Sequence, residues 1–175
     1  MWIYKHKRHE ELKTIFLGLI NSMPNQNIKS NSENVYKSDW NLAKDFKRDY
    51  LYAFYKSFED QMDEICVDFH CTKWEIHNGW FQQYKKSNYH KWHTHPKGNL
   101  SAVYFLELPK KELATEFFNS SKPDIKEGDV IFFPSHMLHR SPRNKTNKRK
   151  TVIAFNCDFF EWDGKEWVLK KINIL

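Results

Sequence analysis

The hydrophobic pattern of the sequence changes once, near residue 70. In residues 10–23 the apolar residues recur at three- and four-residue spacing, and in residues 40–68 they recur near every fourth residue, so we expect two amphipathic helices. After residue 70 the apolar runs become short and rich in aromatic and β-branched residues, which is typical of strands. A protein with its helices first and its strands afterwards is expected to form an α+β fold.

Turn-forming residues, among them Gly128 and the pair Asn78-Gly79, divide the second part of the sequence. The runs between the turns predict strands at residues 73–76, 80–84, 90–95, 100–108, 114–118, 130–133, 151–157 and 167–175. We expect these strands to close into a barrel or a sandwich. The length of 175 residues suits one domain, 1–175, with residues 1–70 as a helical buttress and residues 71–175 as the β-barrel catalytic core.

Composition excludes several classes of protein. The apolar runs are too short to span a bilayer and the first residues do not resemble a secretory signal, so we expect a cytoplasmic location without a membrane. Three cysteines without close spacing predict buried thiols rather than disulfides. The net charge is +6, but the main basic cluster, residues 140–150, has no aromatic residues between its charges. We therefore expect no nucleic-acid partner.

Histidines gather at the edges of the expected strands. His93 and His95 are two residues apart, so in an extended conformation their side chains project from the same face. His139 follows a second apolar run, residues 128–134. This order predicts a metal site at the mouth of the barrel, and imidazole binds zinc, iron, copper and nickel. Hydrolytic-zinc and cupin motifs are disfavoured because they need an acidic residue soon after His95, and residues 96–100 contain none.

Three segments carry a resemblance to a known family. His93-Thr94-His95-Pro96, followed by residues 100–106, resembles the first metal-binding strand and turn of the 2-oxoglutarate/Fe(II)-dependent oxygenases, in particular small hydroxylases of bacteria and marine phages. Residues 128–139 are similar to the segment that ends in their distal iron histidine, and residues 150–156 to their last barrel strand. The resemblance implies an α+β double-stranded β-helix (jelly-roll, cupin-like barrel) with the N-terminal helices packed on one sheet.

The resemblance also implies a set of cofactors and their ligands. His93, His95 and His139 would hold Fe(II), with 2-oxoglutarate as co-substrate and O2 as oxidant. The usual triad of the superfamily has an aspartate or glutamate where His95 stands, so the iron would be one unit more positive here. Asp129 is the other available carboxylate, and we expect it to cap the turn that begins at Gly128.

The resemblance further implies that a cation about ten residues after the distal histidine anchors the distal carboxylate of 2-oxoglutarate. Arg149 and Lys150 both fit this spacing, and only one of them can point inward because strand neighbours alternate faces. The register of the family's strand favours Lys150, whereas two-point carboxylate binding favours Arg149, and Lys150 is preferred. Tyr104 and Tyr84 are further candidates for co-substrate binding.

We therefore expect a 2-oxoglutarate- and Fe(II)-dependent dioxygenase (hydroxylase). It would decarboxylate 2-oxoglutarate to succinate and hydroxylate a protein side chain or a small molecule, in the cytoplasm or, for a phage-encoded enzyme, in the host cytoplasm. The alternative is a cupin-like metal- or ligand-binding protein without oxygenase activity. Substrate identity depends on rim loops and stays open at this point, as does the oligomeric state.

Overall fold

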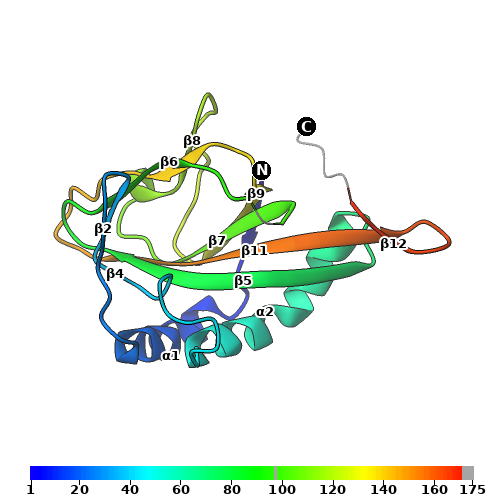
Figure 1. Ribbon diagram of the computed structural model, residues 1–175, viewed down its shortest axis with the longest axis horizontal. Helices are drawn as coiled ribbons and strands as arrows, with labels where there is room; N and C mark the ends of the chain where they lie inside the picture. The colour runs from blue at the N-terminus through cyan, green and yellow to red at the C-terminus, as the bar shows by residue number, and fades with distance from the viewer. Residues whose placement is uncertain (97, 171–175) are drawn as a thin grey trace.

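Two helices and two antiparallel sheets form the structure, a computed structural model that describes residues 1–96 and 98–170. The helices α1 (His9–Ser22) and α2 (Asp49–Asp68) lie on one face of the larger sheet, and the smaller sheet faces its other side (Figure 1). The α+β class is confirmed. Within the described residues, no helix is both long enough and apolar enough to cross a bilayer.

Each sheet is built from strands that are far apart in the sequence. The larger, seven-stranded sheet has the order β1 (Trp2–Lys5), β9 (Asp129–Pro134), β7 (Leu100–Glu107), β11 (Lys150–Trp162), β5 (Lys73–Tyr84) and β4 (Lys37–Ser38), and β12 (Trp167–Leu169) pairs with β11. The smaller, five-stranded sheet has the order β2 (Ile28–Lys29), β3 (Glu33–Val35), β6 (Tyr89–His93), β10 (His139–Ser141) and β8 (Glu116–Phe117). A 3-10 turn, η1 (Lys111–Leu113), lies between β7 and β8.

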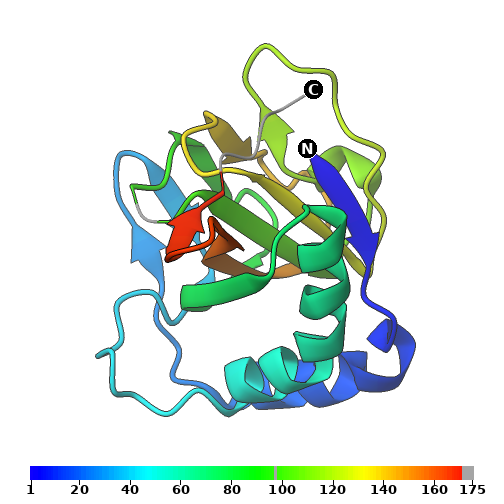
Figure 2. The same cartoon turned by 90° about the vertical axis from the view of Figure 1, so that its right-hand side faces the viewer.

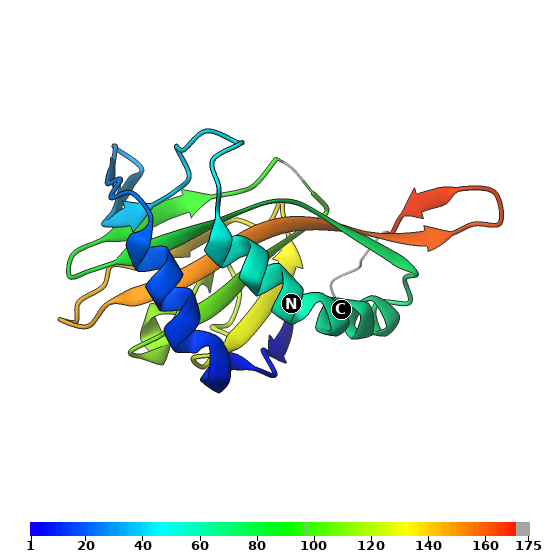
Figure 3. The same ribbon diagram turned by 90° about the horizontal axis from the view of Figure 1, so that it is seen from below.

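Neighbouring residues of the central strands point into two different cores. On β9, Val130 and Phe132 pack against the helices, whereas Ile131 and Phe133 lie between the two sheets. Strands β7 and β11 alternate in the same way, because successive side chains of a strand project to opposite faces. Figures 2 and 3 show both helices on the same side of the larger sheet. A sheet covered on both faces explains the near-continuous apolar sequence of these strands.

The second helix begins later than the apolar spacing predicted, so the prediction is wrong for residues 40–48. The Asp39 carboxylate accepts hydrogen bonds from Arg48 Nε at 2.9 Å and from Tyr50 Oη at 2.6 Å. The Arg48 guanidinium also donates to main-chain oxygens of residues 39–46. Asp39 O and Ala43 O also accept the main-chain N–H groups of Leu42 and Phe46, three residues on, so the segment forms turns of a loop that Arg48 holds rather than a helix.

The predicted strands 73–76 and 80–84 form one continuous strand, β5, which pairs with β11 along its length. The pair Asn78-Gly79 lies inside this strand, so the prediction of a turn there is wrong. A Cβ on residue 79 would collide with Tyr55 Oη of α2. Any larger residue would force side chains of α2 to shift, so glycine fits the close approach of the helix rather than a turn.

The remaining strand predictions differ in their bounds. Strands 100–108, 130–133 and 151–157 are confirmed by β7, β9 and β11, strand 90–95 ends at His93, and strand 114–118 is reduced to Glu116–Phe117. Strand 167–175 is seen as Trp167–Leu169, and residues 171–175 lie outside the described residues. The short strands β1, β2, β3, β4 and β10 were not predicted, because two to four residues carry no readable periodicity.

Two buried histidines connect the N-terminal segment to the helices and the larger sheet. His6 and His9 are each 1% exposed. His6 Nε2 lies 3.2 Å from Ser57 Oγ of α2, and its ring stacks on Phe58 with centroids 5.4 Å apart. His9 Nδ1 lies 2.6 Å from Tyr104 Oη. Burial lowers the pKa of both imidazoles, that of His6 to about 4, so both are neutral in the folded protein at neutral pH.

We expect these histidines to make the fold sensitive to acid. The pKa of His6 is about 4 in the folded protein against an ordinary value of 6.5, so the unfolded protein takes up the proton first. The free energy of unfolding should then fall by roughly 3 kcal/mol from His6 alone as the pH falls from about 6.5 to about 4. Urea unfolding of wild type, His6→Phe and the exposed control His136→Phe across this range tests it, and an unchanged pH dependence in His6→Phe contradicts it.

Candidate metal centre and the cleft around it

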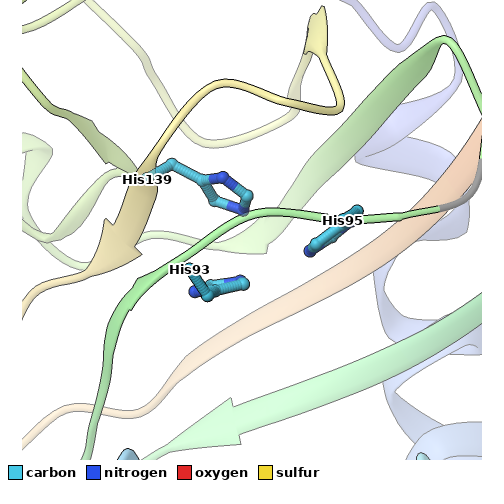
Figure 4. Close-up of side chains that lie close together, drawn as sticks. All are labelled: His93, His95 and His139. Atoms are coloured by element: carbon cyan, nitrogen blue, oxygen red, sulfur yellow. The ribbon is translucent and has the colours of Figure 1, made fainter.

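Three histidines converge at one end of the smaller sheet (Figure 4). His93 ends β6, His139 begins β10, and the two residues are directly paired across these strands. His95 lies two residues beyond β6, where its main-chain N–H donates to Ser135 O at 2.9 Å. One ligand atom from each imidazole lies within 4.8 Å of the others. The structure thus brings the three predicted ligands together.

Each imidazole has its Nδ1 atom engaged in a hydrogen bond. His93 Nδ1 lies 2.8 Å from Lys91 O, and His139 Nδ1 lies 2.8 Å from Met137 O. A carbonyl oxygen only accepts, so these Nδ1 atoms carry the proton and the Nε2 lone pairs are left free. Metal-binding histidines are commonly oriented by a hydrogen bond of this kind. The arrangement fits a metal ion held by Nε2 atoms.

His95 is oriented by a network of polar side chains on the larger sheet. Its Nδ1 lies 2.8 Å from Asn156 Oδ1 of β11 and 2.9 Å from Ser101 Oγ of β7. Ser101 Oγ donates to the same Asn156 oxygen at 2.7 Å, and Asn156 Nδ2 donates to Asn78 Oδ1 at 2.9 Å. These bonds fix the Asn156 amide with its oxygen towards the histidine. Sequence reasoning did not single out Ser101 or Asn156, although each is a polar residue inside an apolar strand.

Burial lowers the pKa of all three imidazoles. The pKa of His139 falls to about 3, with the neighbouring His93 adding to the effect of burial. His90 stacks on His93 with ring centroids 3.8 Å apart, and its pKa is also lowered to about 3 by burial and by His93. All these rings are therefore neutral at neutral pH and have no proton to lose before a metal binds.

No carboxylate of the described residues joins the three histidines. Asp129 is buried at the start of β9, where its Oδ2 accepts a hydrogen bond from the Lys126 main-chain N–H at 2.7 Å. It therefore closes the turn at Gly128, which has a φ of 89°. The candidate group therefore offers neutral nitrogen ligands alone, and residue type leaves zinc, iron, copper and nickel as candidates.

The histidines line a cleft of about 1340 Å³ that extends from between the sheets to the loop of residues 39–48. The part between the sheets is lined by residues that include Tyr84, Thr115, Ser141, Lys150 and Val152. The outer part is lined by residues that include Trp40, Phe46, Tyr52, His77 and Gly79. His93, His95 and His139 line the same cleft as both sets of residues.

Lys150 is buried at the inner part of the cleft. Its side chain is on the β11 face that also carries Val152 and Asn156, and only 2% of the residue is exposed. Nζ donates to Leu113 O at 2.7 Å and to Ser141 Oγ at 2.9 Å. Burial lowers the pKa of Lys150 to about 7, with Lys122 adding a smaller effect. A buried ammonium with two neutral partners is poised to accept an anion.

The other three candidates for co-substrate binding divide between the cleft and the opposite face. Tyr84 lines the cleft, and its Oη donates to Gln82 Oε1 at 2.7 Å. Arg149 does not reach the cleft, because its Nε pairs with Glu107 Oε2 at 2.7 Å. Tyr104 does not reach it either. It lies opposite Ile153 on the helix-facing side of the sheet, fully buried in the helical core.

Comparison with known proteins confirms the resemblance found in the sequence. Residues 78–125 match the model of a family described as "Putative 2OG-Fe(II) oxygenase", and this segment contains His93 and His95. No sequence among the curated proteins matches this one. The protein therefore resembles the 2-oxoglutarate/Fe(II)-dependent oxygenases over this segment, as expected.

Solved structures share the fold over most of the sequence. The viral collagen prolyl hydroxylase of Paramecium bursaria Chlorella virus-1, in complex with 2-oxoglutarate, aligns with a TM-score of 0.58 over 90% of this protein and 96% of that one, at 16% identity. A prolyl-4-hydroxylase of Pseudomonas putida aligns with a TM-score of 0.58 over 92% of both proteins, at 9% identity. HygX from Streptomyces hygroscopicus, with nickel and 2-oxoglutarate bound, aligns with a TM-score of 0.59 over 89% of this protein and 81% of that one, at 9% identity. These likenesses confirm the expected double-stranded β-helix fold.

We expect Asn156→Ala to weaken metal binding by about 10-fold, because it removes the acceptor that orients His95. Asn78→Ala is the matched control: it removes the same kind of side chain one hydrogen bond farther from the histidine. Titration with Co²⁺, followed by its visible absorption, measures both affinities, and thermal unfolding checks that both variants fold. An equal loss of affinity in the two variants would contradict this role of Asn156.

Proposed function

We propose that the protein is a 2-oxoglutarate- and Fe(II)-dependent dioxygenase that hydroxylates a protein side chain or a small molecule. The observation that carries the proposal is the presence, in one cleft, of three converging imidazoles and the buried ammonium of Lys150. A histidine metal site alone suits many functions. A buried cation in the same cleft favours an anionic ligand, and 2-oxoglutarate carries a carboxylate at each end.

His93, His95 and His139 would hold the iron through their Nε2 atoms. These atoms are free because each Nδ1 is hydrogen bonded, and burial keeps the rings neutral. Three protein ligands leave coordination positions open, as in other non-haem iron oxygenases. Bound iron would supply the chemistry by which 2-oxoglutarate and O2 become succinate and CO2 while one oxygen atom enters a C–H bond of the substrate.

Lys150 would bind the distal carboxylate of 2-oxoglutarate. An ammonium has three N–H donors, and Leu113 O and Ser141 Oγ use two of them, so the third remains for the carboxylate. The rings of Tyr84 and Phe105 have their centroids 5.1 and 5.8 Å from Nζ and restrict the access of water. A charge-assisted hydrogen bond is strengthened in such surroundings.

The apolar wall of the cleft would keep the reacting groups dry. Val103, Val152 and Ala154 lie between the sheets and line the cleft. The ring of Trp80 packs against His95 with centroids 5.5 Å apart. These apolar side chains cannot hydrogen bond to water, so they would help to exclude it from the cleft. Exclusion of water limits side reactions with solvent.

Succinate formation tests the reaction class. With Fe(II), 2-oxoglutarate and O2, the protein is expected to form succinate slowly in the absence of substrate, and His139→Ala is expected to reduce this to the background of free iron. The exposed His136→Ala is the control. Without O2, iron and 2-oxoglutarate together should give a weak visible charge-transfer band. Metal binding without the band and without succinate would instead support the cupin-like alternative.

Replacement of Lys150 and of Arg149 tests which of them binds 2-oxoglutarate. Lys150→Met is expected to raise the KM for 2-oxoglutarate by about 10- to 100-fold, because a charged hydrogen-bond partner is lost while the apolar stem is kept. Arg149→Met should leave this KM unchanged, since Arg149 pairs with Glu107 on the other side of the sheet. Steady-state kinetics of uncoupled turnover measures both. A larger effect from Arg149→Met would overturn the assignment.

Proton uptake tests the charge state of Lys150. Its pKa is lowered to about 7 by burial, and a bound carboxylate would raise it again. At pH 8.5 the amine is mostly neutral before binding and charged afterwards, so close to one proton is taken up, whereas at pH 6 it is charged throughout. Calorimetry of 2-oxoglutarate binding to the Ni²⁺-loaded protein in buffers of different ionisation enthalpy measures the uptake. Uptake that persists in Lys150→Met contradicts the prediction.

A further inference from the structure

The larger sheet has an unpaired edge beside the cleft. On the side of β5 away from β11, strand β4 pairs only with residues 82–83. The next residue whose main-chain groups face this edge is Phe81, and side chains satisfy both groups. Its N–H donates to Asp39 Oδ1 at 2.9 Å and its oxygen accepts from Ser38 Oγ at 2.8 Å. From Gly79 towards the start of β5, no described strand covers this edge.

Gly79 turns its main-chain groups towards the open edge. In an antiparallel pair, alternate residues direct their N–H and C=O groups to the same neighbouring strand. Gln83 O accepts from Tyr36 N on the β4 side, and Phe81 points the same way. The N–H and C=O of Gly79 therefore also point away from β11, and neither has a hydrogen-bond partner among the described residues. Unpaired N–H and C=O groups at a sheet edge are a template on which another strand can pair.

Tyr55 places a second unpaired group at the same position. Its Oη is buried without a hydrogen-bond partner in the described part of the protein. It lies where it would contact a Cβ on residue 79. Burial raises the pKa of the phenol well above its ordinary range, so the hydroxyl keeps its proton and remains a donor. An unpaired buried donor is unfavourable, and an acceptor brought by a ligand would satisfy it.

The open edge leads directly to the metal centre. Asn78, the neighbour of Gly79, is bonded to Asn156, whose oxygen orients His95. On the solvent side, the loop of residues 39–48 carries Trp40, which is 52% exposed. Its ring packs edge-to-face on Trp80 at 4.5 Å. An extended peptide lying along the edge would thus pass an aromatic wall and bring one side chain to the histidines.

We propose that the substrate is an extended polypeptide segment that pairs with the β5 edge at Gly79 and presents a side chain to the metal centre. Strand addition satisfies main-chain donors and acceptors at regular spacing, which a polypeptide supplies. This rests on the proposed function: one oxygen atom of O2 enters a C–H bond of the presented residue and the other enters succinate, while CO2 leaves 2-oxoglutarate. The exposed rings of Phe46 and Tyr52 would contact side chains of the bound segment.

The first experiment compares a random-sequence decapeptide library with a mixture of free amino acids of the same composition. The library is expected to raise succinate formation severalfold above the uncoupled rate and to yield peptides one oxygen atom heavier. The free amino acids are expected to do neither. Uncoupled turnover without stimulation by peptides overturns the proposal while leaving the oxygenase function intact. Absence of uncoupled turnover overturns the proposed function itself, so the two failures are distinguishable.

The second experiment uses one hydroxylated peptide from the library, N-methylated at one residue at a time. Pairing with an edge strand predicts that methylation of alternate residues abolishes hydroxylation and that methylation of the residues between them does not. Binding of the unmethylated peptide to the Ni²⁺-loaded protein is expected to slow hydrogen exchange of the Gly79 amide by at least about 10-fold. If hydroxylation is lost on methylation of every residue alike, or if hydrogen exchange of the Gly79 amide is unchanged, the proposed strand pairing is overturned.

Discussion

The register of β11 is the constraint on which the rest of the structure depends. This strand pairs with β7 on one side and β5 on the other, and its side chains alternate between the two faces of the larger sheet. Ile153 and Phe155 enter the helical core, whereas Lys150 and Asn156 enter the cleft. A slip by one residue would move the ammonium into the helical core and an aromatic ring into the cleft. Packing of the helices therefore positions the polar groups of the site.

Burial sets the charges of the site before any ligand arrives. It keeps the three imidazoles neutral and weakens the positive charge of Lys150. Four basic side chains can thus share one cleft without strong mutual repulsion. A metal dication would bring positive charge into the cleft, and the two carboxylates of a bound dicarboxylate would balance it. The same desolvation that makes each isolated charge costly makes their mutual attraction strong.

The parts of the site that follow local spacing could be predicted from the sequence. His93 and His95 were expected on one face because they are two residues apart, and the same alternation indicated that only one of Arg149 and Lys150 points inward. The preference for Lys150 came from the register of the family's last strand. Tyr104 was a candidate for co-substrate binding because β7 is apolar on both faces, so the sequence does not indicate that its side chain meets the helices. That choice depends on the pairing of Tyr104 with Ile153, a contact between strands far apart in the sequence.

The predicted bounds of helices and strands were wrong where tertiary contacts outweigh local preference. The apolar spacing of residues 40–48 indicates a helix, yet the bonds of Arg48 to Asp39 and to nearby main-chain oxygens hold a loop. Gly79 was interpreted as part of a turn, although it lies in β5 where Tyr55 approaches closely. Both errors fall on the walls of the outer cleft, which are shaped by contacts between side chains rather than by periodicity.

The proposed ligand set of three histidines would affect how Fe(II) and 2-oxoglutarate bind. A dication held by three neutral imidazoles keeps its full charge, whereas an aspartate in place of His95 would halve it. The metal itself is then held less strongly, but a dicarboxylate is attracted more strongly because it meets the whole dication together with Lys150. Since linkage is reciprocal, the dicarboxylate must strengthen metal binding by the same factor. Iron and 2-oxoglutarate would therefore bind with greater mutual dependence than at a site with a carboxylate ligand.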